Sequence, residues 1–242
     1  MEENYLLAKK IVSKRFDEDN KFYPFFVLAI YGELTVFKNY KDFIEEIFDN
    51  VLIIISNKTI NNTMLENNLD PEAFFNNDNS NEEIYKTEAI SYCGYDCDFD
   101  GEKLKAVKTD PFIICTTFYN NSWEHLLAAF IHEFSHIIKG AINGCHISKD
   151  KNYSIFTTRC GLSIFKLIYD KNKNEFSQNV SYEILDEVIN CAHTNDIINE
   201  ILAIKDIIPD QKISNFLEIL NKRYLKDTGY ERASNSFKPL WR

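Results

Sequence analysis

The chain has 242 residues, of which 45% are hydrophobic and 14% aromatic, with only 7 glycines and 5 prolines. This composition excludes collagen-like, low-complexity and wholly disordered proteins, and the length suits one well-packed domain. Lysine and arginine number 27 against 37 acidic residues, so the net charge is −10. General nucleic-acid binding needs a basic surface, and so does docking on an anionic membrane. We therefore expect neither nucleic acid nor a membrane as a partner.

The N-terminus begins with acidic residues and lacks the basic flank and apolar run of a signal peptide. The longest apolar stretch, residues 22–31, contains Pro24 and is half the length of a membrane-spanning helix, which needs about 20 residues. We expect this stretch to lie in the core of a cytoplasmic protein. The six cysteines then fit reduced, mostly buried thiols.

In chain order, residues 2–16 and about 40–56 place apolar side chains at helical spacing, although 51–55 fits a buried strand equally well. Residues 57–81 are rich in asparagine and predict a long surface excursion. Three short runs of β-branched and aromatic residues then predict strands at 89–95, 104–108 and 112–118. An Asp-Gly turn is predicted between the first two of them.

The rest of the chain favours helices, at residues 123–139, 182–205 and 213–225, before an irregular tail over 229–242. Helices, then strands, then helices predict an α+β fold. We expect one domain over residues 1–242, with an N-terminal lobe over about 1–140 and a mainly helical C-terminal lobe over about 141–242.

The motif that carries chemistry is HEFSH at residues 132–136, inside the predicted helix 123–139. Ser122 is a good N-cap for this helix, and Gly140 is a natural C-terminal stop. Histidines at positions i and i+4 point within about 40° of each other, one turn apart, so both can reach one zinc ion. Glu133 flanks that point and can act as the general base that takes a proton from zinc-bound water.

His132 and His136 could instead form a polar stripe on a solvated helix, or be satisfied core histidines. Their neighbours at 128–131 and 137–138 are almost all apolar, which predicts a mostly buried helix. Burying His-Glu-His without a ligand would leave several polar groups to satisfy. We therefore predict that His132 and His136 bind Zn2+.

Residues 130–138 resemble the active-site helix of zincin metallopeptidases, and the predicted strand 112–118 fits their order of sheet followed by active-site helix. The resemblance covers residues 110–200. It implies a zincin-like fold, with a small twisted N-terminal sheet, a backing helix and the active-site helix. It also implies that an extended peptide binds along an edge strand, for which 89–95 and 104–108 are the candidates.

A catalytic zinc needs a third protein ligand, while water occupies the fourth position. The metzincin pattern would place Gly at 139 and His at 142, but the chain has Lys139 and Ile142, which excludes that subclass. The gluzincin pattern places a glutamate on a later helix, and residues 184–190 resemble that segment. This resemblance implies Glu187 as the third zinc ligand.

Three residues compete with Glu187 for this role: Glu183 one turn earlier, Glu200 farther along, and His146, which a short loop could bring back. The segment also departs from the family pattern beside its glutamate, in Asp186 for Asn, Val188 for Gly and Cys191 for an acidic residue. Thr194 stands where the family often has Thr.

Peptide hydrolysis also needs a donor aimed at the developing oxyanion. In related enzymes this donor is a Tyr, His or Arg near the third ligand. The chain offers five such residues, among which the spacing does not choose: Tyr182, Tyr153, His146, His193 and Arg159.

The resemblance implies a zinc-dependent metallopeptidase that acts on a peptide or protein substrate, with Glu133 as general base. A regulatory protease of a mobile element that cuts a repressor, or a secreted effector, would share this chemistry. A zinc-stabilised peptide-binding module without turnover is the alternative from another class. The retained Glu133 argues against it, because a structural zinc site needs no general base.

Overall fold

The computed structural model describes residues 1–71, 88–101, 103–119, 122–141, 144–160, 163–181, 183–204, 213–215 and 217–218. Within these residues the strands form two separate sheets among helices, so the expectation of a mixed α and β fold is confirmed. The elements in chain order are α1 (Glu2–Val12), α2 (Tyr23–Val36), η1 (Lys38–Tyr40), α3 (Lys41–Asn50), β1 (Leu52–Ser56), α4 (Ile60–Glu66), β2 (Ala89–Phe99), β3 (Leu104–Thr116), α6 (Trp123–Ala141), β4 (Cys145–Lys149), β5 (Tyr153–Cys160), β6 (Ser163–Asp170), β7 (Glu175–Ser181) and α7 (Glu183–Ala203).

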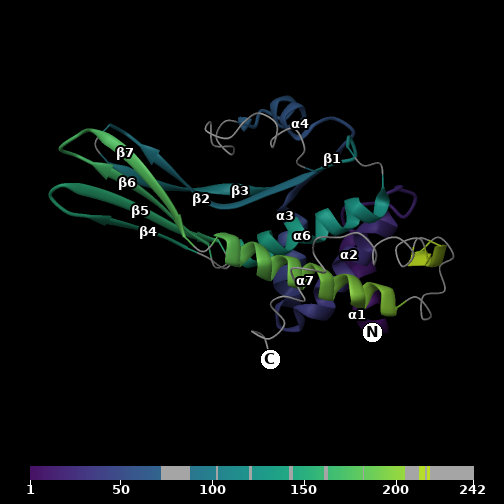
Figure 1. Ribbon diagram of the computed structural model, residues 1–242. Helices are drawn as coiled ribbons and strands as arrows, with labels where there is room; N and C mark the ends of the chain where they lie inside the picture. The colour runs from purple at the N-terminus through teal and green to yellow at the C-terminus, as the bar shows by residue number, and fades with distance from the viewer. Residues whose placement is uncertain are drawn as a thin grey trace.

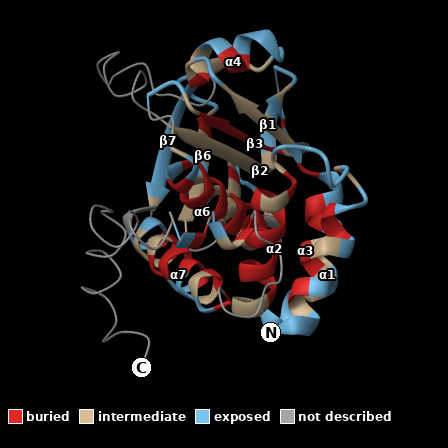
Figure 2. Ribbon diagram, turned by 90° about the vertical axis from the view of Figure 1, so that its right-hand side faces the viewer, coloured by how far each residue is buried: buried red, intermediate tan, exposed pale blue. Residues whose placement is uncertain are grey.

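The helix α2 forms the centre of the main core. Its residues from Phe25 to Leu34 are buried, and Pro24 lies in the first turn, where a missing backbone N–H costs nothing. This confirms that the apolar stretch 22–31 is a core segment. Figure 2 shows α2 and α6 as the most buried helices. Within the described residues, no helix is long and apolar enough to cross a membrane.

The first sheet has the strand order β1-β3-β2. β3 pairs in parallel with β1 and antiparallel with β2, so the predicted strand 112–118 is central over Phe112–Thr116 and 89–95 lies at an edge. The predicted strands 104–108 and 112–118 form one continuous strand, β3. The predicted Asp-Gly turn is confirmed, since Gly101 has a φ of 91° at the end of the β2–β3 hairpin.

Between α2 and β2, the structure decides between the two interpretations of residues 40–56 and corrects the prediction for residues 57–81. Residues 40–56 contain both expected structures, the helix α3 and the strand β1. The surface excursion predicted for 57–81 is wrong at its start, because α4 buries Ile60 and Met64 against Ile114 of β3. Residues 72–81 lie outside the described part of the chain.

The mainly helical C-terminal lobe is wrong over residues 145–181. This segment forms the second sheet, four antiparallel strands in the order β4-β5-β6-β7. Two Asx turns join its strands: Asp150 Oδ1 accepts from the backbone N–H of Asn152 at 2.7 Å, and Asp170 Oδ1 accepts from that of Asn172 at 2.9 Å. Asn174, with a φ of 57°, completes the second turn. These turns bound runs of β-branched and aromatic residues in β5 and β6, which are typical of strands.

The predicted helix 182–205 is confirmed as α7, although residues 182 and 205 lie outside the described part. Of the predicted helix 213–225, the described residues 213–215 and 217–218 are helical. The tail 229–242 is outside the described residues. Figure 1 shows α6 between the first sheet and the helices α2 and α7. Contacts between α6 and α7 place these two helices side by side.

Candidate metal centre

The helix α6 begins at the residue and buries the face that the sequence predicts, but it ends at Ala141, so Gly140 lies inside the helix and is not its stop. Leu126 N–H donates to the backbone oxygen of Ser122 at 3.1 Å, and Ser122 Oγ accepts from His125 N–H at 3.5 Å, as expected of an N-cap. Phe134, Ile137 and Ile138 are at most 1% exposed and anchor the helix in the main core. This packing fixes the direction in which the HEFSH motif points.

His132 and His136 meet Glu187 across the contact between α6 and α7. The Nε2 atoms of the two histidines are 3.2 Å apart. Glu187 Oε2 lies 3.2 Å from His132 Nε2, and Glu187 Oε1 lies 3.0 Å from His136 Nε2. Of the candidate third ligands whose side chains the structure describes, Glu187 is therefore the one that lies against the two histidines.

These separations are slightly shorter than the spacing of ligands around one zinc ion. Ligands at 2.0–2.2 Å from a tetrahedral zinc are about 3.3–3.6 Å from one another, so small side-chain shifts would admit the ion. The side chain of Glu187 is 51% exposed, whereas those of His132 and His136 are 8% and 14% exposed. The site is therefore walled by protein on the histidine side and open to solvent on the glutamate side.

Hydrogen bonds at the far side of each imidazole point its Nε2 atom into the site. Thr194 Oγ1 donates to the Asn190 carbonyl at 2.9 Å, so its contact of 3.4 Å with His132 Nδ1 is one in which Nδ1–H donates. His136 Nδ1 lies 3.4 Å from Asp186 Oδ2 and donates to it. In the neutral tautomers that metal binding requires, with hydrogen on both Nδ1 atoms, the two Nε2 lone pairs face each other beside the Glu187 carboxylate. A cation between the two Nε2 atoms would remove the repulsion between their lone pairs and the carboxylate. A carboxylate at Nδ1, such as Asp186 beside His136, is typical of metal-binding histidines.

The charges around the site favour a cation as well. Burial lowers the pKa of His136, but hydrogen bonds to Asp186 and Glu187 outweigh burial and raise this pKa to about 10. Burial raises the pKa of Glu187, but hydrogen bonds from His132 and His136 outweigh it and hold this pKa below its usual range. Both shifts stabilise the carboxylate and a positive charge next to it.

Two further contacts fix the neighbouring groups. Asn190 Nδ2 donates to the His132 carbonyl oxygen at 2.6 Å, which ties α7 to the backbone of α6 at the motif. Lys139 Nζ lies 3.6 Å from Asp186 Oδ1, so Asp186 bridges Lys139 and His136. Of these neighbouring residues, Thr194 matches the family pattern in the sequence, whereas Asp186 differs from it. Asn190 was missed, although it lies on the same face of α7, one turn after Glu187.

Glu133 has a partner that no local motif announces. Ser91 Oγ of β2 donates to Glu133 Oε2 at 2.6 Å. Ser91 pairs with Ile113 in the register of the first sheet, which directs its side chain to the face that α6 covers. A single serine in a strand gives no sequence signal, so this contact could be found only from the packing of α6 on β2.

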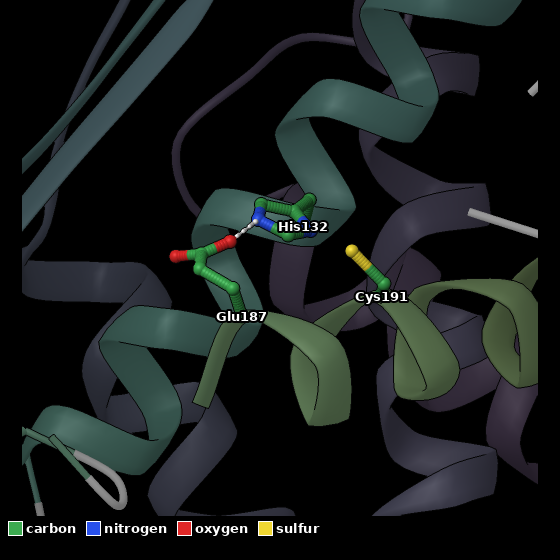
Figure 3. A group of neighbouring side chains, drawn as sticks. All are labelled: His132, Glu187 and Cys191. Atoms are coloured by element: carbon green, nitrogen blue, oxygen red, sulfur yellow. Dashed lines mark hydrogen bonds and ion pairs between the residues drawn. The ribbon is translucent and has the colours of Figure 1, made fainter. Parts of the chain in front are cut away.

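A thiol completes the group of donor atoms. His132, Glu187 and Cys191 each offer a ligand atom, and these three atoms lie within 4.8 Å of one another. Figure 3 shows Cys191 one turn after Glu187 on α7, with its sulfur directed toward the His132 ring. Burial and the Glu187 carboxylate raise the pKa of the Cys191 thiol to about 11.

The other candidate ligands lie elsewhere or outside the described part. Within the described residues, the cluster of candidate metal ligands does not include His146, which is exposed on β4 and pairs with Thr157 of β5. Glu200 is 13 residues beyond Glu187 on α7, about 20 Å along the helix axis. The side chain of Glu183 is outside the described part.

The oxyanion candidates are spread over several elements. Tyr153 and Arg159 lie on β5 of the second sheet. His193 lies on α7 and packs edge-on against Phe37, with ring centroids 5.2 Å apart, and burial followed by the charge of Lys139 lowers its pKa to about 4. Tyr182 is outside the described residues.

No protein-family model, curated protein or solved structure matches this chain. The class of the protein is therefore inferred from its own residues.

Proposed function

We propose that this chain is a zinc-dependent metallopeptidase with a zincin-like fold. The observation that carries the proposal is the convergence of His132 Nε2, His136 Nε2 and the Glu187 carboxylate, with separations of 3.0–3.2 Å. The glutamate Glu133, which a purely structural metal site would not need, lies between the two histidines in sequence. This combination of two histidines, a carboxylate and an adjacent base is that of a hydrolytic zinc site.

The donor set favours zinc over the other common divalent cations. Calcium and magnesium take oxygen ligands, whereas two imidazole nitrogens and one carboxylate suit zinc. Three protein ligands leave one position open, and the exposed Glu187 lies on the solvent side. When bound there, zinc would supply a Lewis acid that polarises a peptide carbonyl and makes water more acidic.

Glu133 supplies the proton transfer in the proposed reaction. Its Oε2 atom is held by Ser91 Oγ at 2.6 Å, and we assign Oε1 to take a proton from the attacking water. The same carboxyl group then gives that proton to the leaving amine. The Ser91 hydroxyl can donate to the ionised carboxylate and accept from the protonated one, so it supports both states.

The edge of the first sheet is the proposed binding site for the substrate. Among the described strands, β2 pairs with β3 alone. An extended peptide that adds to this edge beside residues 89–95 would pass next to Ser91 and therefore next to Glu133. Peptide or protein is the substrate class that suits such an edge.

Glu133→Gln tests this function directly, with Glu46→Gln on the exposed side of α3 as a control. We expect the zinc-loaded wild type to cleave members of a peptide library. Loss of the base lowers this rate about 10²- to 10⁴-fold, while the zinc content stays unchanged because Glu133 is not a ligand. Mass spectrometry of the library and elemental analysis measure the two quantities.

Equal cleavage by Glu133→Gln and wild type would refute the assigned role of Glu133. A wild type that holds zinc and binds library peptides without cutting them would point instead to a metal-stabilised peptide-binding module.

A further inference from the structure

The two helices of the site each offer donors at positions i and i+4. On α6 these are His132 and His136, and on α7 they are Glu187 and Cys191. Residues four apart lie on the same side of a helix, and α6 and α7 are packed against each other. Facing helices that contribute such pairs are a common way to build a metal site inside a helical layer.

Cys191 belongs to this group by position and by distance. Its sulfur lies within 4.8 Å of ligand atoms of both His132 and Glu187 (Figure 3). The edges of a zinc tetrahedron that includes one sulfur are about 3.5 Å long, so the thiol must close part of this separation to bind. One rotation about the Cys191 side chain moves the sulfur while the helix stays in place.

We propose that the Cys191 sulfur is a fourth ligand of the same metal ion. It would occupy the coordination position that water needs for hydrolysis. This inference rests on the proposed function and adds a closed form to it, in which the ligands are two nitrogens, one carboxylate and one thiolate. On binding, the Cys191 thiol would release its proton to solvent, and one metal–sulfur bond would replace the metal–water bond as the water leaves. When the sulfur leaves, it takes up a proton again, and water occupies the fourth position.

The chemistry of the four donors explains why such a form is stable. Four protein ligands are typical of closed zinc sites, and thiolate is a strong ligand for zinc and cobalt. The other side of the site is solvent-exposed at Glu187, so the thiol competes with water and not with a buried group. Substrate that enters from this side would displace the sulfur and open the site.

Cobalt(II) absorption spectroscopy tests the inference with the metal alone as the probe. The full chain is loaded with Co2+ under a reductant without thiols, and a thiolate ligand produces a charge-transfer band in the near ultraviolet. We compare the wild type with Cys191→Ser and Cys191→Ala, so that a folding defect in one variant does not decide the result. Cys93→Ser is the matched control, because Cys93 approaches the backbone oxygens of His136 and Ile137 at 3.9 Å but is outside the donor cluster.

We expect the band in the wild type and in Cys93→Ser, and its loss in both Cys191 variants while Co2+ is still bound. Co2+ bound by the wild type without the band would overturn the sulfur ligand and leave the proposed function standing. A band that persists in the Cys191 variants would also overturn it. A wild type that binds no Co2+ would contradict both the sulfur ligand and the metal site of the proposed function.

Discussion

At the scale of single residues, the candidate site depends on groups that orient the chemistry-bearing side chains. Asp186 and Thr194 each contact the Nδ1 atom of one histidine, and Ser91 holds the carboxylate of Glu133. The two histidines and the glutamate between them could be predicted from five consecutive residues. Ser91 could not, because the contact depends on how a strand 42 residues away packs against α6.

Ser91→Ala tests the orientation of Glu133. Losing a hydrogen bond to an ionised carboxylate costs about 1.5–3 kcal/mol, so we expect kcat to fall about 10- to 100-fold with KM and zinc content unchanged. Ser91→Thr retains the hydroxyl on a β-branched side chain suited to a strand and should keep most of the activity. Steady-state kinetics on a cleaved library peptide measure this. An unchanged kcat in Ser91→Ala would show that the contact does not serve catalysis.

A second residue-scale prediction concerns the buried carboxyl group behind the motif. Glu33 of α2 is fully buried, and Ser135 Oγ donates to its Oε1 at 3.0 Å. Burial raises the pKa of Glu33 to about 8, although Ser135 and the charge of Lys139 lower it in part. Glu33 is therefore neutral in the folded protein and ionised in the unfolded chain between about pH 4.5 and 8.

Over this range the unfolded chain binds fewer protons than the folded one, so Glu33 makes the protein less stable as pH rises. Glu33→Gln removes the titration and keeps the shape of the neutral side chain. The difference in unfolding free energy, variant minus wild type, should increase by up to about 1.4 kcal/mol per pH unit from pH 5 to 8. Urea denaturation at several pH values measures the difference, and parallel curves for the two proteins would contradict it.

At the scale of elements, sequence reasoning succeeded where one pattern controls one element. α6 has its N-cap at Ser122 and its apolar face toward the core, both of which the sequence predicts. The sequence does not predict the second sheet, because few of its described residues are fully buried and β7 is exposed along nearly its whole length. Such strands show little contrast between a buried and a solvent face, and the turns at Asp150 and Asp170 are the clearest marks of their ends.

The packing of α2 on α7 gives an element-scale prediction. A Cβ atom at Gly32 would overlap the Ile197 side chain and lie 3.2 Å from Ile201. Ile197 is β-branched and stiff in a helix, so α7 has to move. We expect Gly32→Ala to cost about 1–3 kcal/mol of unfolding free energy and to weaken zinc binding, because α7 carries Glu187.

Gly144→Ala is the control for this change, since no atom lies within 4 Å of a Cβ at that position. Chemical denaturation and a zinc-chelator competition measure the two effects. If Gly32→Ala and Gly144→Ala behaved alike in both, the close approach of α2 and α7 would not position the site.

At the scale of the whole molecule, the site joins parts of the chain that lie far apart in sequence. The motif precedes the second sheet and Glu187 follows it, yet both helices share the main core through buried residues such as Phe134 and Ile198. The far end of the β2–β3 hairpin meets the second sheet in a smaller cluster that includes Leu104 and Phe156. The pairing of α6 with α7 could be expected from the family resemblance alone. The second sheet, which lies between these helices in the sequence, could not be expected from it.

The central claim is a metal ion held between α6 and α7, and the metal content of the purified, untagged protein tests it most directly. Elemental analysis compares the wild type with the double variant His132→Ala/His136→Ala, prepared in parallel. We expect about one zinc per chain in the wild type and its loss in the double variant, because Glu187 and Cys191 alone do not hold a zinc site. A folded wild type that contains no metal and takes up no added zinc would contradict the claim and leave the His-Glu-His stripe as a packing feature.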